Sequence, residues 1–279
     1  MANIKQTRKQ RWQDDHSGEP VLVFDNVSFG SGVRPVLRNV SFKLMGDETR
    51  ILLGATGAGK SVLLKLADGL LRPDAGSIQV FGKEVGDMSE KDLLVLRTDV
   101  GMLFQESALF DSLCVRDNVA YELIEDHVPS EEVDQRVRQA LKYVELEKSF
   151  GAFPPELSGG MQRRVAIARA IINDPDLLLY DSPTGGLDPV SAAAIEDLII
   201  KQRDIHGCCS LLVTERLQDV SIISTHYFDS GVNRITKLPD HHEDKNTTFL
   251  FLHEGTIVLD GSISDLVHSH DPFIRAFLE

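Results

Sequence analysis

Eight consecutive residues of the chain have the types and spacing of a loop that binds phosphate groups. Residues 54–61, GATGAGKS, fit the pattern G-x-x-x-x-G-K-[ST] at every fixed position. Glycines let the backbone turn tightly and present its N–H groups to a phosphate chain. Lys60 would place a positive charge on the outer phosphates, and Ser61 would offer a hydroxyl to Mg²⁺. The predicted cofactor-binding residues here are Gly54, Ala55, Thr56, Gly57, Ala58, Gly59, Lys60 and Ser61.

The residues around this loop supply the context that the motif requires. An apolar run at residues 50–53 predicts a buried strand before it. After it, Leu63, Leu66, Ala67 and Leu70 recur at helical spacing, which predicts a helix whose N-terminus carries a partial positive charge. The alternative is a glycine-rich turn that binds nothing, and the strand, loop and helix order disfavours it.

Two further residues are predicted to hold a metal ion together with Ser61. Asp181 ends the apolar run at residues 177–181, the position at which phosphate-loop enzymes hold Mg²⁺. Gln105 ends another apolar run, at residues 99–104, and is placed to reach the same ion. The predicted metal ligands are therefore Ser61, Gln105 and Asp181.

A second candidate anion site lies at residues 157–162, LSGGMQ, where a helix begins. Ser158 at the N-cap, with the N–H groups of Gly159 and Gly160, would present donors to an anion. One chain with two phosphate-binding surfaces indicates that two chains meet around the nucleotide.

Composition excludes several classes of protein. The chain has 279 residues, of which 42% are apolar and 26% charged, as in soluble proteins. No stretch approaches the ~20 apolar residues of a membrane span, and no signal peptide opens the chain, so we expect a cytoplasmic protein. A net charge of −14 argues against nucleic acid as a partner. The three cysteines, Cys114, Cys208 and Cys209, have no metal or redox spacing.

The elements that must position these residues alternate between strand and helix. We expect a flexible polar tail at residues 1–20, and strands at 21–24, 36–44 and 49–53 that form a small antiparallel sheet leading into the phosphate loop. A helical insertion follows, with helices at 115–124 and 130–144. Strands at 177–181 and 209–213 alternate with helices, which predicts a parallel sheet covered on both faces.

The stretch at residues 226–246 is polar and includes the sequence HHED at 241–244. A metal site is one interpretation, but no other ligand is placed near it, so we favour a solvated loop. Beyond it we expect strands at 248–252 and 256–259 and two short helices from residue 262 onward.

In these motifs and their order, the chain resembles the ATP-binding subunit of ABC transporters over roughly residues 21–270. Residues 54–61 match the phosphate loop, Gln105 the Q-loop, 157–162 the signature, 177–181 the Walker B strand and 186–188 the D-loop. The resemblance implies an α/β phosphate-loop NTPase core of ABC type. It further implies a small antiparallel lobe, a helical subdomain at about residues 106–165 and a C-terminal helix at 271–279.

The resemblance also implies ATP and Mg²⁺ as cofactors and a head-to-tail pair of cassettes, expected to be a homodimer. Each ATP would lie between the phosphate loop of one cassette and the signature of the other. Phe29 follows the first strand, where an aromatic ring either stacks on the nucleotide base or packs in the core, and the resemblance favours stacking. The nucleotide-binding residues added in this way are Phe29, Ser158, Gly159, Gly160 and Gln162.

Residues 101–113, GMLFQESALFDSL, and the ending at 271–278 resemble the ATPases of MCE-type lipid transporters, the Mla group. This implies a subunit on the cytoplasmic face of the inner membrane, bound to a permease and its MCE proteins. We expect docking through residues 107–119, where Leu109, Phe110, Leu113 and Val115 form an apolar cluster. The alternative is ordinary packing of this cluster inside the helical subdomain.

Two catalytic positions depart from the family pattern. Ser182 stands where the family has the glutamate that acts as general base, and Glu215 stands where it has the switch histidine. A serine cannot act as a carboxylate base, although Glu215 could substitute in part. The chain is thus either an ATPase that drives a transporter or a subunit that binds ATP and turns it over slowly. A soluble ABC protein of translation or DNA repair is disfavoured, since this chain has neither a second cassette nor a long coiled coil.

Overall fold

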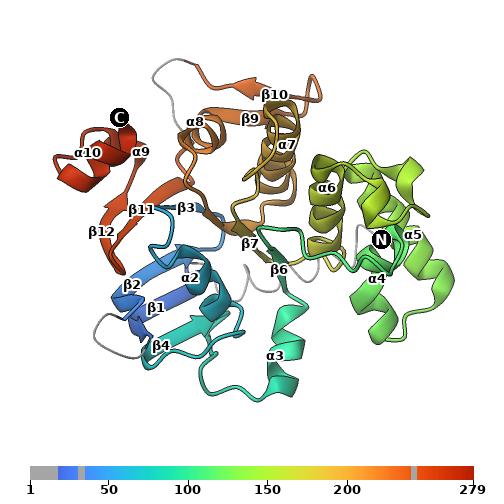
Figure 1. Ribbon diagram of the computed structural model, residues 1–279, viewed down its shortest axis with the longest axis horizontal. Coiled ribbons are helices and arrows are strands. Elements are labelled where there is room, and N and C mark those ends of the chain that lie inside the picture. Colours follow the sequence, from blue (N-terminus) through green and yellow to red (C-terminus); the bar gives the residue numbers. More distant parts are fainter. Residues whose placement is uncertain (1–17, 31–34, 240–243) are drawn as a thin grey trace.

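The central sheet has six strands in the order β12-β11-β3-β8-β7-β6 among the residues that this computed structural model describes, 18–30, 35–239 and 244–279 (Figure 1). Strand β12 is antiparallel to β11, and the other neighbouring pairs are parallel. Parallel strands end at one edge of a sheet, so the loops after β3, β8 and β7 lie next to one another. The strands are β3 (Thr49–Leu53), β6 (Val100–Leu103), β7 (Leu177–Asp181), β8 (Cys209–Val213), β11 (Thr247–His253) and β12 (Thr256–Gly261).

A second sheet is antiparallel, with the order β2-β1-β4-β5. It consists of β1 (Pro20–Phe29), β2 (Leu37–Met45), β4 (Ala75–Val80) and the short β5 (Lys83–Glu84). The prediction that residues 49–53 join this sheet is wrong, because β3 pairs with β11 and β8 instead. All five residues of β3 are buried, as expected of a parallel strand covered on both faces.

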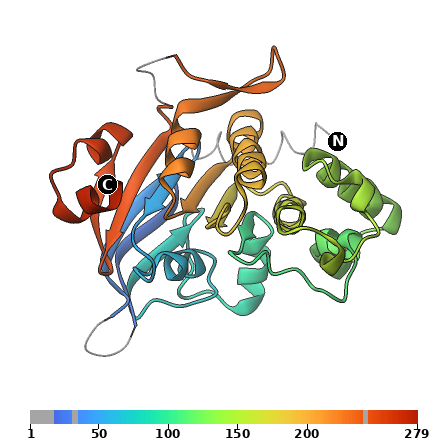
Figure 2. The same cartoon turned by 45° about the horizontal axis from the view of Figure 1, so that its top comes forward.

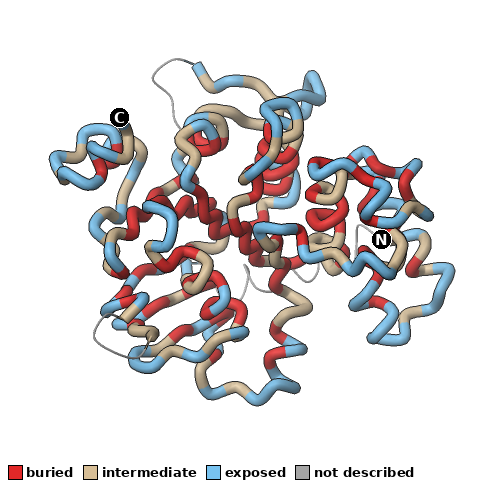
Figure 3. The backbone as a smooth tube through the Cα atoms, in the orientation of Figure 1, coloured by how far each residue is buried: buried red, intermediate tan, exposed pale blue. Residues whose placement is uncertain are grey.

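Both faces of the central sheet are covered. Alternate residues of β3 and β7 belong to two separate hydrophobic clusters: Ile51 and Tyr180 to one, Leu52 and Leu179 to the other. Successive side chains of a strand point to opposite faces, so the uninterrupted apolar runs reflect burial on both sides. Figure 3 shows the buried residues concentrated along this sheet.

Helix α2 (Lys60–Ala67) follows the phosphate loop, but it is shorter than predicted. Gly69 has a φ of 67°, which ends the helix, and Leu70 beyond it is 46% exposed. Helix α3 (Glu90–Arg97) was not predicted from the sequence. Helices α7 (Pro189–His206) and α8 (Leu217–Thr225) pack together above the central sheet in Figure 1.

The inserted helices form a separate lobe beside the sheet, as predicted. It contains α4 (Val115–Glu125), α5 (Ser130–Tyr143) and α6 (Gly159–Ala170), with the 3₁₀ turns η1 (Glu147–Ser149) and η2 (Pro154–Glu156). Figure 2 shows this lobe on the opposite side of the sheet from the terminal helices α9 (Ile263–Val267) and α10 (Pro272–Leu278). The boundaries of the tail and of the subdomains remain predictions, and residues 1–17 of the tail lie outside the described part of the chain.

Residues 226–246 are not simply a solvated loop. They contain the antiparallel strands β9 (His226–Asp229) and β10 (Arg234–Lys237), in which Ile235 pairs with Phe228. The sequence HHED at 241–244 allowed a metal site as one interpretation, and residues 241–243 lie outside the described ranges. Among the described residues, no group of His, Cys, Asp and Glu is arranged to hold a metal ion.

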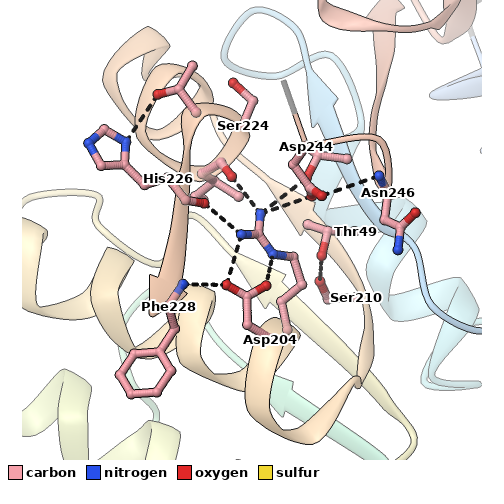
Figure 4. A network of polar contacts seen from close by, with 12 residues as sticks. Thr49, Asp204, Ser210, Ser224, His226, Phe228, Asp244 and Asn246 are labelled. Carbon is pink, nitrogen blue, oxygen red and sulfur yellow. Dashed lines mark hydrogen bonds and ion pairs between the residues drawn. The ribbon is translucent and has the colours of Figure 1, made fainter. Parts of the chain in front are cut away.

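A buried arginine fixes the chain around this hairpin. Arg203 on α7 forms ion pairs with Asp204 at 2.7 Å and Asp244 at 3.1 Å, and it donates to the carbonyl oxygens of Ile223 at 2.6 Å and His226 at 2.7 Å. Figure 4 shows Asp204, His226 and Asp244 converging there. These contacts join α7, the end of α8 and the return to β11. No helix in the described ranges has the length and apolarity needed to cross a bilayer.

Candidate functional site

The glycine loop connects β3 to α2 at the carboxyl edge of the central sheet. Gly54, Gly57 and Gly59 have φ angles of 150°, 81° and 105°, at which a residue with a Cβ is strained. A Cβ on Gly54 would lie 2.3 Å from the carbonyl oxygen of Leu252. Around a Cβ on Gly57, by contrast, there is no atom within 4 Å among the described residues. The loop therefore packs closely against the sheet at Gly54. Beside Gly57 it leaves space in which a phosphate group has room.

Lys60 directs its ammonium group back into this loop. The residue is 7% exposed, and Nζ donates to the carbonyl oxygens of Gly54 at 2.7 Å and Ala55 at 2.9 Å. Burial lowers the pKa of Lys60, while the charges of Glu215 and Asp181 act to raise it. A cation held against the loop is placed to neutralise bound phosphates.

Asp181 and Ser61 meet beside the loop. Asp181 is 5% exposed, and its Oδ1 accepts a hydrogen bond from Ser61 Oγ at 3.0 Å. Burial raises the pKa of Asp181, and the hydrogen bond from Ser61 acts to lower it. Carboxylate and hydroxyl oxygens are the ligands that Mg²⁺ prefers, so this pair fits the metal. Gln105 is exposed, two residues beyond β6, and its role as a ligand remains a prediction.

The second predicted anion site lies on the helical lobe. Ser158 is the N-cap of α6, and its Oγ accepts from the backbone N–H of Met161 at 3.3 Å. Gln162 donates to the carbonyl oxygen of Pro154 at 2.8 Å, which ties the first turn to η2. A Cβ on Gly160 would lie 2.5 Å from Ser191 Oγ, so this glycine permits close packing on α7. This site and the phosphate loop thus belong to different lobes of one chain (Figure 1).

The family model described as "ABC transporter" matches residues 37–185, more than half of the chain. The chain belongs to the ABC transporter family. It is 37% identical over 256 residues to the protein TRIGALACTOSYLDIACYLGLYCEROL 3, chloroplastic, of Arabidopsis thaliana, a match that covers 88% of this chain and 70% of that protein. This ABC chain is accordingly an ATP-binding cassette, an ATPase subunit, with the α/β fold expected for it.

Two bacterial relatives have different printed functions. The intermembrane phospholipid transport system ATP-binding protein MlaF of Haemophilus influenzae is 36% identical over 204 residues, 73% of this chain and 77% of its own length. The methionine import ATP-binding protein MetN 2 of Bacillus cereus is 39% identical over 207 residues, 73% of this chain and 61% of its own length. The MetN match thus spans less than two thirds of that relative.

Solved structures show the same architecture. A dimeric post-hydrolysis state of the ATP-binding cassette MJ0796, bound to ADP and Pi, superposes with a TM-score of 0.72 at 26% identity, covering 87% of this chain and 98% of that one. The fold of cbiO1 from Clostridium perfringens, part of the transporter complex cbiONQ, gives a TM-score of 0.74 at 24% identity, covering 90% and 92%.

The two positions predicted to depart from the family pattern, Ser182 and Glu215, both lie at the phosphate-loop edge of the sheet. Ser182 follows Asp181 with a φ of 47°, and its N–H donates to the carbonyl oxygen of Val213 at 2.8 Å. Glu215 follows β8, is exposed, and accepts a hydrogen bond from Thr56 of the phosphate loop at 2.6 Å. The structure therefore brings Glu215 against the phosphate loop of the cassette.

A buried acid that sequence reasoning missed supports this edge. Asp219 on α8 is fully buried and accepts hydrogen bonds from Thr184 Oγ1 at 2.8 Å and Thr214 Oγ1 at 2.6 Å. Thr184 follows the Walker B strand and Thr214 precedes Glu215, so Asp219 joins the two loops. Burial and the neighbouring Asp219 raise the pKa of Glu196 on α7 to about 7. An aspartate in the first turn of α8, beside the apolar Val220, was the available signal.

Phe29 and Asp188 also make contacts within the chain. Phe29 ends β1 half-buried and packs against the cluster that lies under the antiparallel sheet, and its stacking on a nucleotide base remains a prediction. Asp188 of the D-loop is the N-cap of α7 and accepts from the N–H groups of Val190 and Ser191, each at 3.0 Å.

Proposed function

We propose that this chain uses ATP to drive a membrane permease that moves a phospholipid or another lipid. The observation that carries the ATP part is the convergence of Lys60, Ser61 and Asp181 beside an open glycine loop. Two relatives support the lipid part by their printed names, one a trigalactosyldiacylglycerol protein and the other a phospholipid transport ATPase. Other relatives are named for methionine or ribonucleotides, so a transport assay decides the cargo.

A groove between the central sheet and the helical lobe supports docking of the permease. It has a volume of about 420 Å³ and is lined in part by Leu70, Phe110 and Tyr121, which are 46%, 44% and 41% exposed. The ring centroids of Phe110 and Tyr121 are 5.0 Å apart. Exposed apolar side chains gathered in a groove suit a partner segment.

The proposed docking segment at residues 107–119 contributes only part of its apolar cluster to this groove. Phe110 lines it, whereas Val115 is fully buried in the core of the helical lobe and Leu109 packs against that core. The alternative of internal packing is therefore correct for Val115. We propose that a permease loop contacts Phe110 and its neighbours, which places the cassette at the membrane face that holds the permease and its MCE partners.

The paired anion sites support a dimer of cassettes. The phosphate loop and Ser158 lie on different lobes, so a head-to-tail second copy would bring its signature to the bound nucleotide. We propose a homodimer with ATP and Mg²⁺ in two composite sites, with Phe29 against the base and Gln105 at the metal.

The experiment isolates the cassette with its permease from native membranes and reconstitutes the complex with labelled phospholipid. We expect lipid transfer that requires Mg-ATP and is lost in Lys60→Ala. Crosslinks from position 110 to a permease loop are expected in the same complex, whereas position 131 on α5 serves as an exposed control. Transfer of methionine rather than lipid, or an intact complex without crosslinks at position 110, would contradict the proposal.

A second candidate function follows from Ser182 and Glu215: a regulatory subunit that binds ATP and closes without turnover. The same reconstituted complex distinguishes it. Phosphate release coupled to transfer supports the motor, whereas ATP-dependent dimerisation without phosphate release supports the regulatory subunit.

A further inference from the structure

We propose that Glu215 is the carboxylate base for ATP hydrolysis in this cassette, replacing the glutamate that is absent at Ser182. The inference rests on the proposed ATP-driven function and deepens it, because it assigns the proton acceptor of that same site. Four observations carry it: the strand order, the contact with the phosphate loop, the charges around Lys60 and the hydrogen bonds that hold the turn at residues 214–216.

The strand order places Glu215 beside both halves of the phosphate site. Strand β8 lies between β3, which leads into the glycine loop, and β7, which ends at Asp181. Glu215 is the second residue after β8. Since parallel strands end at a common edge, the backbone of Glu215 lies between the glycine loop, which would bind phosphate, and Asp181, which would bind the metal.

The side chain of Glu215 turns toward the phosphate loop. Its Oε2 accepts from Thr56 Oγ1 at 2.6 Å, between residues that are 159 positions apart in the sequence. Thr56 lies just before Gly57, the part of the loop that faces open space. A carboxylate at this place is near the outer phosphate position, because Lys60 and the loop determine where phosphates lie.

The charges of two carboxylates, Glu215 and Asp181, act to raise the pKa of Lys60. Of the two, only Asp181 belongs to the proposed metal site. Asp181 is buried and hydrogen-bonded to Ser61 in the proposed metal site. Glu215 is exposed, and its charge acts to raise the pKa of Lys60 more than the charge of Asp181 does. An exposed carboxylate can take a proton from water and release it to solvent, whereas a metal-bound one cannot.

The backbone on either side of Glu215 is held firmly. Thr214 donates to buried Asp219 at 2.6 Å, and the N–H of Arg216 donates to Thr214 Oγ1 at 3.0 Å. The guanidinium of Arg216 donates to the carbonyl oxygen of Thr184 at 2.8 Å. A residue between two anchored neighbours starts from a fixed position, which is what a general base requires.

In the proposed step, a water oxygen attacks the γ-phosphorus of ATP and one water proton passes to the Glu215 carboxylate. The bond between γ-phosphorus and the β–γ bridging oxygen breaks, and its electron pair leaves with ADP. Inorganic phosphate forms, and protonated Glu215 later releases its proton to solvent. Ser182 cannot take this role, because an alcohol oxygen does not accept a proton near neutral pH.

The test compares Glu215→Gln with wild type in the full chain, using a single turnover of Mg-ATP with protein in excess. Glutamine keeps the shape and can still accept from Thr56, but it cannot take a proton. We expect hydrolysis to slow by at least about 100-fold while ATP affinity stays the same or becomes a few-fold tighter. The matched control, Glu131→Gln on the exposed first turn of α5, should hydrolyse ATP within about twofold of wild type.

Each outcome separates the inference from the proposed function. If Glu215→Gln hydrolyses ATP as fast as wild type or faster, Glu215 is not the base, although the cassette can still be a motor. If wild type binds Mg-ATP without hydrolysing it, the inference is overturned and the regulatory function is favoured. If wild type binds no Mg-ATP at all, the proposed function itself fails.

Discussion

Ser61 and Asp181 are 120 positions apart, yet Ser61 Oγ donates a hydrogen bond to Asp181 Oδ1 at 3.0 Å. The contact exists because only β8 separates β3 from β7 in the sheet, so their carboxyl ends face a common site. A hydroxyl and a carboxylate held together in this way would offer a pair of oxygen ligands to a metal ion beside Lys60.

Lys60→Ala should weaken Mg-ATP binding by at least about 100-fold, or roughly 3 kcal/mol. The variant removes the cation that Gly54 and Ala55 hold inside the loop. Titration with a fluorescent ATP analogue measures the effect. Lys83→Ala, an exposed lysine on β5, is the matched control and should bind as wild type does. Equal affinity of Lys60→Ala and wild type would show that the nucleotide lies elsewhere.

Ser158→Arg should abolish the ATP-dependent dimer while leaving the monomer folded. The residue is an exposed N-cap, so a long cationic side chain there would block the approach of a second phosphate loop. Sedimentation with and without Mg-ATP measures the dimer. Ser158→Ala is the control, because it removes only the cap, which costs about 1 kcal/mol of stability, and should still dimerise. Wild-type sedimentation by the arginine variant would count against the composite site.

Ser182→Glu combined with Glu215→His should raise ATP turnover by at least about tenfold with little change in affinity. The double variant restores the residue types that the family has at both positions, a base beside Asp181 and a donor near the outer phosphate. Steady-state phosphate release, at saturating Mg-ATP, measures it. A wild type that already turns over as fast as the double variant would disprove the prediction that Ser182 and Glu215 limit the rate of hydrolysis.

Asp68→Asn should stabilise the protein more at high pH than at low pH. Asp68 is 6% exposed, faces Arg97 at 3.7 Å and also lies near Glu122, and burial raises its pKa to about 7. The folded state therefore holds this proton more tightly than the unfolded chain, so ionisation destabilises the fold progressively as pH rises from about 4 to 7.

Urea unfolding at pH 5 and pH 8 checks the Asp68 prediction. The gain from Asp68→Asn should be larger at pH 8 by about 2 kcal/mol, since the neutral amide avoids the cost of the buried charge. Asp87→Asn, at an exposed position, should show no such difference. An equal gain at both pH values would mean that Asp68 titrates normally.

The local elements of this cassette were predictable because their signals lie within short windows. Glycine spacing and a flanking apolar run predicted the phosphate loop, and the structure has the expected strand, loop and helix there. The insertion helices α4 and α5 follow amphipathic spacing and begin within a residue of the predicted positions. The carboxylate of Asp181 at the end of a wholly apolar strand was visible for the same reason.

Pairing between distant segments was decided by the tertiary structure alone. The apolar pattern of β3 predicts a buried strand but does not name its neighbours, and those neighbours proved to be β11 and β8 rather than the antiparallel sheet. Likewise, the sequence showed a glutamate at position 215 but not its contact with Thr56, and it gave no reason to connect Asp219 with Thr184. Periodicity records which face of an element is buried, whereas strand order depends on the free energy of packing the whole chain, and that order brought Glu215 to the phosphate loop.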